Sequence, residues 1–389
     1  MDGDAAPGEL RGAIVVTVGL ARPEDEAGIR AVLRASRLPG PVRVAFTREP
    51  RFDAGARLAG ADEVTVVARS GGRVVGLGQA SVYALTRNGA ARRVAYLGLL
   101  RLLPGVRGGV RWLREGYAAL FDALDGAGID AVFTSIGSEN ARARQVLEHG
   151  RRLGLPGYHE LASLVTLVVP VGHGVAGTRA SQPRDARRRV GLTRDGVDRD
   201  GAEVTELTAF LQQRARKAHL GLAWEPRQWT ALGQHGIAAG DFCVVRRGPE
   251  IVGAGAVWDQ RPFRQTVVVG YGPGLRMIRP IVNALRAVRR LPQLPAPGTV
   301  LAQGAVLGAG VADLAVWPEL WRGLRARAAE NGLSWLTFAC DARDPDLPTL
   351  RRLLGAREYR TTLYSVEWGG HGPDDAWDDL PFRPEVGLL

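Results

Sequence analysis

Cysteine, lysine and long apolar runs are all scarce in this chain. Cys243 and Cys340 are its only cysteines. They exclude a disulfide framework and lack the spacing of a zinc site, so we expect two buried core residues and no bound metal. The longest apolar stretch, residues 161–171, is too short to span a bilayer. The opening MDGDAAPGEL lacks the apolar segment of a secretory signal, so we expect a cytoplasmic protein with no membrane contact.

The positive charges come almost entirely from arginine, because Lys217 is the only lysine among 51 basic residues. Against 40 acidic residues, these leave a net charge of +11. Such a charge favours acidic partners, including phosphates, nucleotides, nucleic acid and acidic protein surfaces. The length of 389 residues, with 46% hydrophobic and 23% charged, is typical of a folded protein with two or three domains.

A linker divides the chain into two similar parts. Residues 174–190 are small, polar and basic, with no apolar periodicity. On both sides the patterns predict one order of elements, β-α-β-β-β-α-β-α-β, in residues 12–173 and in residues 191–372, followed by a tail of residues 373–389. This order predicts an α/β (α+β) fold of two tandem domains, each a mixed central sheet flanked by helices.

Two stretches of the first part carry the most specific pattern. Residues 94–113, VAYLGLLRLLPGVRGGVRWL, predict a strand, an Arg-Gly turn and a helix start, and residues 131–150, AVFTSIGSENARARQVLEHG, predict the next strand and helix. In this order they resemble the GCN5-related N-acetyltransferase (GNAT) superfamily. In the second part the resemblance rests on the order of elements and on residues 257–271, 336–341 and 360–368.

The resemblance implies an amide-forming acyltransferase with a pantetheine thioester as co-substrate and no tightly bound cofactor. In the family, two central strands splay apart to hold the pantetheine arm, and a helix N-terminus binds its phosphate. An amine then attacks the thioester directly, helped by a general base and a backbone N–H. The residues that the resemblance assigns to the donor are Leu100, Leu102, Arg107, Gly108, Gly109, Val110, Arg111 and Asn140.

The phosphate-binding turn departs from the family pattern Arg/Gln-x-x-Gly-x-Gly/Ala. Val110 and Trp112 occupy positions where small residues would let the backbone approach a diphosphate. A carrier protein presents the same arm with a single phosphate. We therefore expect an acidic acyl carrier protein as donor rather than free coenzyme A, as in specialised-metabolite pathways such as antibiotic biosynthesis. The arginines expected to face the carrier protein are Arg101, Arg111, Arg114, Arg279, Arg286 and Arg290. The alternative for these arginines is a solvated basic surface.

The catalytic acid and base are missing from the family's usual positions. Leu147 replaces a frequent tyrosine, and the strand before the turn has no carboxylate. The candidates near the expected site are Glu139, His159, Tyr158, Ser135 and Tyr96. A water molecule is the alternative base.

A dense stretch of the second part offers an acceptor site. Trp258, Asp259 and Gln260 end one strand, and Tyr271 closes the next. Together with Tyr96 they are expected to bind a small amine, phosphorylated or nucleotide-like given the basic charge. The alternative is structural, with Asp259 stabilising a turn and Trp258 in the core.

Two other functions stay open at this level. An aminoacyl-tRNA donor would suit a basic surface, although the chain has no long helical arm and no Lys/Arg-rich block. A catalytically inactive binding module would account for the missing tyrosine and carboxylates. If the chain is such a binding module, we expect no acyl transfer from any donor, and we expect the protein to tolerate changes at Arg107 and Asn140.

Overall fold

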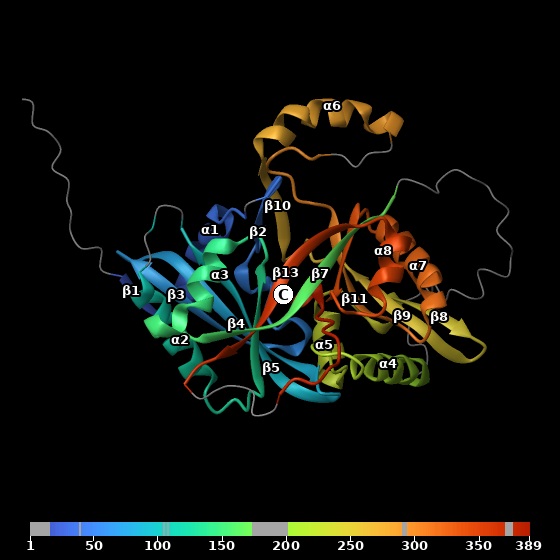
Figure 1. Cartoon of the computed structure of the whole chain (residues 1–389), viewed down its shortest axis with the longest axis horizontal. Helices are drawn as coiled ribbons and strands as arrows, with labels where there is room; N and C mark the ends of the chain where they lie inside the picture. The colour runs from blue at the N-terminus through green and yellow to red at the C-terminus, as the bar shows by residue number, and fades with distance from the viewer. Residues whose placement is uncertain are drawn as a thin grey trace, which may run out of the picture.

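One continuous mixed sheet forms the centre of the computed structural model (Figure 1). Its 11 strands lie in the order β1-β3-β4-β5-β6-β13-β7-β12-β11-β9-β8, and β10 and β2 form a separate two-stranded sheet. The structure describes residues 16–38, 40–103, 106, 109–172, 201–289, 294–369 and 376–389, with the backbone alone at residues 142, 201, 202 and 285–289. The expected linker, residues 174–190, lies outside these residues.

The first half follows the predicted order with β2 added, whereas the described part of the second half begins with α4 and has α5 and α6 outside the predicted order. The strands are β1 (Val16–Leu20), β2 (Val42–Thr47), β3 (Asp62–Ser70), β4 (Arg73–Arg87), β5 (Ala90–Leu102), β6 (Ala131–Gly137) and β7 (Gly157–Pro170) in the first half, and β8 (Phe242–Arg247), β9 (Glu250–Trp258), β10 (Gln265–Tyr271), β11 (Gln303–Val311), β12 (Trp335–Asp341) and β13 (Arg357–Glu367) in the second. The helices are α1 (Glu26–Ala35), α2 (Val110–Leu124) and α3 (Ala141–Glu148), then α4 (Gly201–Ala215), α5 (Pro226–Gln234), α6 (Pro273–Arg289), α7 (Trp317–Glu330) and α8 (Leu347–Leu354). The sequence patterns did not predict β2 and α5.

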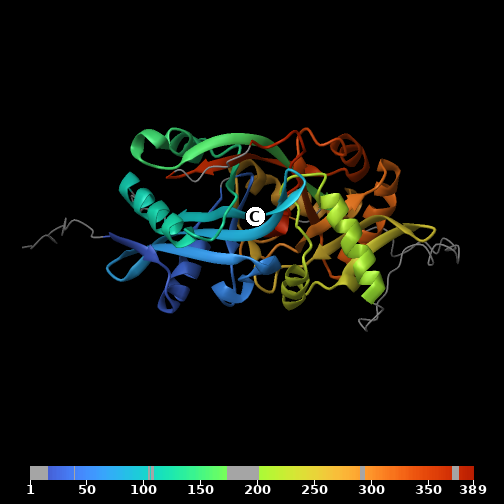
Figure 2. The same ribbon diagram turned by 90° about the horizontal axis from the view of Figure 1, so that it is seen from below.

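The two halves exchange their last strands. β7 lies between β13 and β12, and β13 lies between β6 and β7. β7 pairs antiparallel with β12 over Trp335–Asp341 and with β13 over Arg357–Glu367. Figure 2 shows β7 and β13 side by side across the molecule. The sheet of each half is therefore completed by a strand of the other half.

The two faces of β4 pack against different cores. Ala80 and Val82 contact the apolar side of α2, where Tyr117, Phe121 and Leu124 are buried at helical spacing. Because successive strand residues point to opposite faces, the alternate residues of β4 turn toward the other half of the molecule. The site described below is built on this second face.

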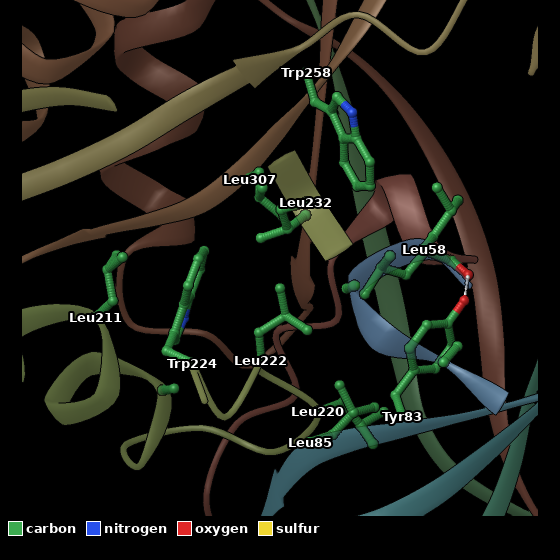
Figure 3. Packing of buried hydrophobic residues seen from close by; sticks show 14 of the residues in the cluster. Leu58, Tyr83, Leu85, Leu211, Leu220, Leu222, Trp224, Leu232, Trp258 and Leu307 are labelled. Atoms are coloured by element: carbon green, nitrogen blue, oxygen red, sulfur yellow. Dashed lines mark hydrogen bonds between the residues drawn. The ribbon is translucent and has the colours of Figure 1, made fainter. Parts of the chain in front are cut away.

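A central cluster joins the two halves on that face (Figure 3). Tyr83 and Leu85 of the first half pack there with Leu222, Trp224 and Trp258 of the second half. The end of the chain enters the same cluster, because the Tyr83 hydroxyl donates a hydrogen bond to the Leu388 carbonyl oxygen at 3.2 Å. Burial of several aromatic side chains at one contact favours a fixed arrangement of the halves.

Candidate active site

β5 and β6 run parallel but separate soon after they meet. They pair only where Val94–Tyr96 faces Ala131–Phe133, whereas β5 continues to Leu102 and β6 to Gly137. Just beyond the paired residues, the Thr134 hydroxyl donates to the Leu97 carbonyl oxygen at 2.6 Å, so a side chain replaces the backbone ladder there. Strands that stop pairing leave backbone N–H and C=O groups free for another partner. The gap can therefore accept an extended chain that carries amide groups.

A β-bulge lies on β5 where the gap begins. Gln79 of β4 pairs with Gly98, but Leu77 pairs with Arg101, so two residues of β5 leave the ladder. Leu99, one of these two, has a φ of 54°, which is uncommon for a residue other than glycine. A bulge leaves its residues unpaired and turns their peptide groups. A free N–H at this position can polarise a carbonyl group in the gap.

The helix α2 begins close to the end of β5. Gly109 is its N-cap in an extended conformation, and no side chain of the described residues caps the helix. An uncapped helix N-terminus offers N–H groups and a positive dipole end to an anion. Arg111 is paired with Glu115 at 2.7 Å on the exposed side of the same helix.

Four polar side chains form a row across the first-half sheet, on the face that looks toward the second half. The row follows the strand register from Glu63 on β3 to Ser81 on β4 and Tyr96 on β5, and it continues to Ser135 on β6, two residues beyond Phe133, the partner of Tyr96. The Ser81 hydroxyl lies 3.5 Å from a Glu63 carboxylate oxygen, and the Tyr96 hydroxyl lies 3.3 Å from the Ser135 hydroxyl. Burial raises the pKa of Tyr96, so its hydroxyl keeps its proton at neutral pH. The row thus places a carboxylate and a protonated phenol on one surface beside the gap.

The second half has the corresponding gap, but the chain fills it. β11 and β12 pair only where Gln303–Ala305 faces Trp335–Thr337, and the bulge residue Gly308 has a φ of 61°. The Gly308 N–H donates to both carboxylate oxygens of Glu385, each at 3.1 Å. Glu385 therefore occupies the N–H group of the second-half bulge, whereas no described carboxylate contacts the first-half bulge residue Leu99 in this way.

The buried Glu385 should make the stability of the protein fall as pH rises. Burial raises the pKa of Glu385 from 4.5 to about 7. The folded state then holds a proton that the unfolded state has lost, so stability decreases between about pH 4.5 and about pH 7, by about 3 kcal/mol in total. His219 acts in the opposite direction, because its burial lowers its pKa.

We therefore expect the difference in unfolding temperature between Glu385→Gln and the unmodified protein to grow over this range. Thermal unfolding at several pH values measures it, with Glu319→Gln as control, and a pH-independent difference would contradict it.

The predicted catalytic residues do not gather at one place. Ser135 and Tyr96 meet at the gap, as described above. The Tyr158 hydroxyl instead contacts the Tyr117 hydroxyl at 2.6 Å, on the α2 side of the sheet. His159 is exposed and contacts Glu367 at 3.1 Å, and Glu139 is exposed beside the start of α3.

The predicted donor residues lie along the gap and at two helix starts. Leu100 and Leu102 belong to the part of β5 that has left β6, and they are 42% and 37% exposed. Gly109 and Val110 begin α2, whereas Arg107 and Gly108 lie outside the described residues. The Asn140 side chain accepts the Ala143 N–H at 3.2 Å and so caps α3.

The predicted acceptor residues of the second half serve mostly its own structure. Trp258 is fully buried and donates to the His235 carbonyl oxygen at 3.0 Å. Asp259 is paired with Arg261 at 2.7 Å in the turn that follows. Gln260 donates to the Gly387 carbonyl oxygen at 2.8 Å. Tyr271 donates to the Pro295 carbonyl oxygen at 2.6 Å.

The predicted carrier-facing arginines lie in two separate regions. Arg111 and Arg114 are exposed on α2. Arg101 lies at the mouth of the gap, where burial lowers its pKa and its guanidinium donates to the Leu100 carbonyl oxygen. Arg279 lies on α6, which stands apart from the sheet in Figure 1, and its guanidinium covers the Tyr271 ring. Arg286 is described by its backbone alone and Arg290 lies outside the described residues.

Sequence patterns missed four residues on the same face of the sheet. Glu63 and Gln79 look like ordinary polar positions of exposed strands, and only the pairing of three strands brings them beside Tyr96. Arg48 and Arg264 come next to them through β2 and β10. A polar residue at an alternating position of an otherwise apolar strand was the one available signal.

Comparison with known proteins finds solved structures of similar fold but no related sequence. No protein-family model and no curated protein matches the chain. The structure is similar to that of Saccharomyces cerevisiae N-myristoyltransferase with bound myristoyl-CoA, at 9% identity and a TM-score of 0.54, over 99% of this chain and 87% of that chain. It is also similar to a GCN5-related N-acetyltransferase from Sphaerobacter thermophilus, at 13% identity and a TM-score of 0.48, over 90% of this chain and 95% of that chain. At identities this low the likeness concerns the fold alone, and the expected α/β fold class, with a mixed sheet flanked by helices, is confirmed.

Two further properties concern the described residues alone. None of their helices is long and apolar enough to cross a membrane. They contain no group of three or more His, Cys, Asp or Glu side chains that could hold a metal ion.

Proposed function

We propose that this protein is an N-acyltransferase that moves an acyl group from a pantetheine thioester to an amine of a small molecule and so forms an amide. The gap between β5 and β6, with the bulge at Leu99, carries this proposal. A pantetheine arm contains two amide groups, so it can pair with strand edges that have lost their partner. The second half supports the assignment of the donor to the first half. In the second half, the bulge N–H of Gly308 is already hydrogen-bonded to the Glu385 carboxylate.

The polar row beside the gap supplies the groups that the reaction needs. The amine nitrogen forms the new C–N bond, the C–S bond breaks, and the thiol leaves. We assign the proton of the amine to the Glu63 carboxylate, which is the carboxylate of the row. We assign the proton taken up by the thiolate to Tyr96, whose raised pKa keeps its hydroxyl protonated. The free N–H groups of the bulge stabilise the oxyanion.

An acyl carrier protein fits the donor site better than free coenzyme A. Val110 begins α2 in place of a small residue, which restricts the approach of a diphosphate. The uncapped N-terminus of α2 still suits a single phosphate. Arg114 adds positive charge on the exposed side of the same helix, where an acidic carrier could dock.

Calorimetric titration with two donors tests this function. We expect an acidic phosphopantetheinylated carrier protein to bind, with an affinity that falls as salt rises. Arg114→Glu should weaken that binding by about tenfold, because it places a repulsive charge at the docking surface. Arg322→Glu, an exposed change on α7, is the matched control and should have no effect. Acetyl-CoA should bind weakly. If acetyl-CoA bound tightly and the carrier protein did not bind, the donor would be coenzyme A and not a carrier protein. If neither donor bound, the proposed function would be contradicted.

A further inference from the structure

An arginine lies buried beside the polar row without a carboxylate partner. Arg48 follows β2 and is only 5% exposed. One of its terminal nitrogens, Nη2, donates to the Gln79 side-chain oxygen at 3.0 Å, and its guanidinium lies 4.9 Å from the centre of the Phe52 ring. The other terminal nitrogen, Nη1, is buried and has no hydrogen-bond partner among the described residues. A buried cation without an opposite charge is costly, so it needs an explanation.

A second arginine lies near the first at the end of the two-stranded sheet. The ladder of β10 and β2 ends where Gln265 is opposite Thr47, and Arg264 and Arg48 are the next residues beyond this last pair, close enough for the Arg264 charge to act on Arg48. Arg264 donates from Nη1 to the Gly387 carbonyl oxygen at 2.9 Å, and its buried Nε has no hydrogen-bond partner in the described part of the chain. Burial, helped by the Arg264 charge, lowers the pKa of Arg48 to about 9, which still leaves it charged at neutral pH.

The surroundings do not neutralise these two cations. Glu63 is the carboxylate that acts on Arg48, and its oxygens contact the Gln79 and Ser81 side chains at 3.4 and 3.5 Å instead. Neither arginine forms an ion pair with any described carboxylate. Two positive charges thus meet one negative charge in the interior, and the balance favours an added anion.

The arginine pair lies next to the gap that the proposed function assigns to the thioester. Gln79, which binds Arg48, pairs with Gly98 immediately before the bulge. The charge of Arg264 contributes to the pKa of Tyr96, so Arg264 also lies near the start of the gap. A molecule that presents an amine to the gap therefore has its other end within reach of the two guanidinium groups.

We propose that Arg48 and Arg264 bind a carboxylate of the acceptor, so that the acceptor is an amino acid or another amine that carries a carboxylate. The proposal rests on the function proposed above. Each guanidinium has one buried nitrogen without a partner, and two such donors suit the two oxygens of one carboxylate. In this arrangement Glu63, whose carboxylate contacts the Gln79 side chain that binds Arg48, is the group that receives the ammonium end.

Binding without any donor tests the carboxylate site separately from acyl transfer. The probes are glycine, β-alanine and 4-aminobutyrate, each compared by calorimetry with its amide, and aminomethylphosphonate represents phosphorylated amines. We expect at least one amino acid to bind at least about tenfold more tightly than its amide. Arg48→Met should abolish this difference, whereas Arg51→Met, an exposed change at the neighbouring ion pair with Asp53, should preserve it.

The unfolding temperature distinguishes a ligand site from a structural role. Arg48→Met removes an unpaired buried charge, so it should leave the unfolding temperature unchanged or raise it while binding is lost. Equal affinity for acids and amides, a preference for the phosphonate, or a fall in unfolding temperature on Arg48→Met would overturn the proposal. Selective binding of a carboxylate without transfer from any donor would uphold the site and contradict the acyltransferase. If the acyl group were transferred equally fast to the amino acids and to their amides, the acyltransferase would be upheld and the carboxylate site contradicted.

Discussion

Replacing Glu63 by Gln should lower kcat for acyl transfer by about a hundredfold or more, while the acceptor still binds. Glutamine keeps the size of the side chain and an acceptor oxygen for Ser81, but it cannot take a proton. General bases contribute roughly 10²–10⁴-fold to such reactions. Among the other candidates, His159 is exposed and Tyr158 faces α2, so neither replaces Glu63 at the row.

Steady-state kinetics with a matched control measures this effect. Asp62→Asn changes the neighbouring carboxylate on β3, which is 60% exposed and paired with Arg93. Because successive strand residues face opposite sides, this change should leave kcat within about threefold of the unmodified protein. A Glu63→Gln protein with nearly full kcat would show that another group, such as a water molecule, takes the proton.

Neither half of the chain should fold when it is expressed alone. The first half without β13 would expose an edge of both β6 and β7, which otherwise pair with β13 over Phe133–Gly137 and Gly157–Val168. The second half would lose β7 from between β12 and β13. Uncovered strand edges and the apolar surface of the central cluster favour aggregation rather than a stable fold.

Two fragments test this expectation. Residues 1–172 and residues 201–389 should each lack a cooperative thermal transition when purified alone. Mixed during refolding, they should recover one transition, because the exchanged strands supply most of the contact between them. A first fragment that unfolds cooperatively by itself would contradict the account, since its sheet would then be complete without β13.

The order of elements could be predicted because each element carries its own local pattern. The α2 helix has apolar residues at helical spacing, and β4 and β5 form a long apolar hairpin. β2 was missed because its pattern VRVAFT is short and its partner, β10, lies in the other half.

The site could be predicted less well, because it depends on contacts between distant residues. The two motifs correctly indicated the strands β5 and β6, and the resemblance indicated that they splay apart. The exchange of β7 and β13 leaves no mark in either half, because both strands are ordinary apolar strands of their own half. The meeting of Arg48 with Arg264 likewise depends on the register of β2 with β10. No spacing in the sequence connects residues so far apart.

Amide hydrogen exchange with an acyl-pantetheine thioether tests the central claim most directly, because it compares the two halves in one experiment. If the gap between β5 and β6 holds the donor, the amides around Leu99–Leu102 should become protected, and those around Gly308–Val311 should not change, because Glu385 already occupies that position. Protection at β11, or no protection on β5, would contradict the assignment of the donor site to the first half.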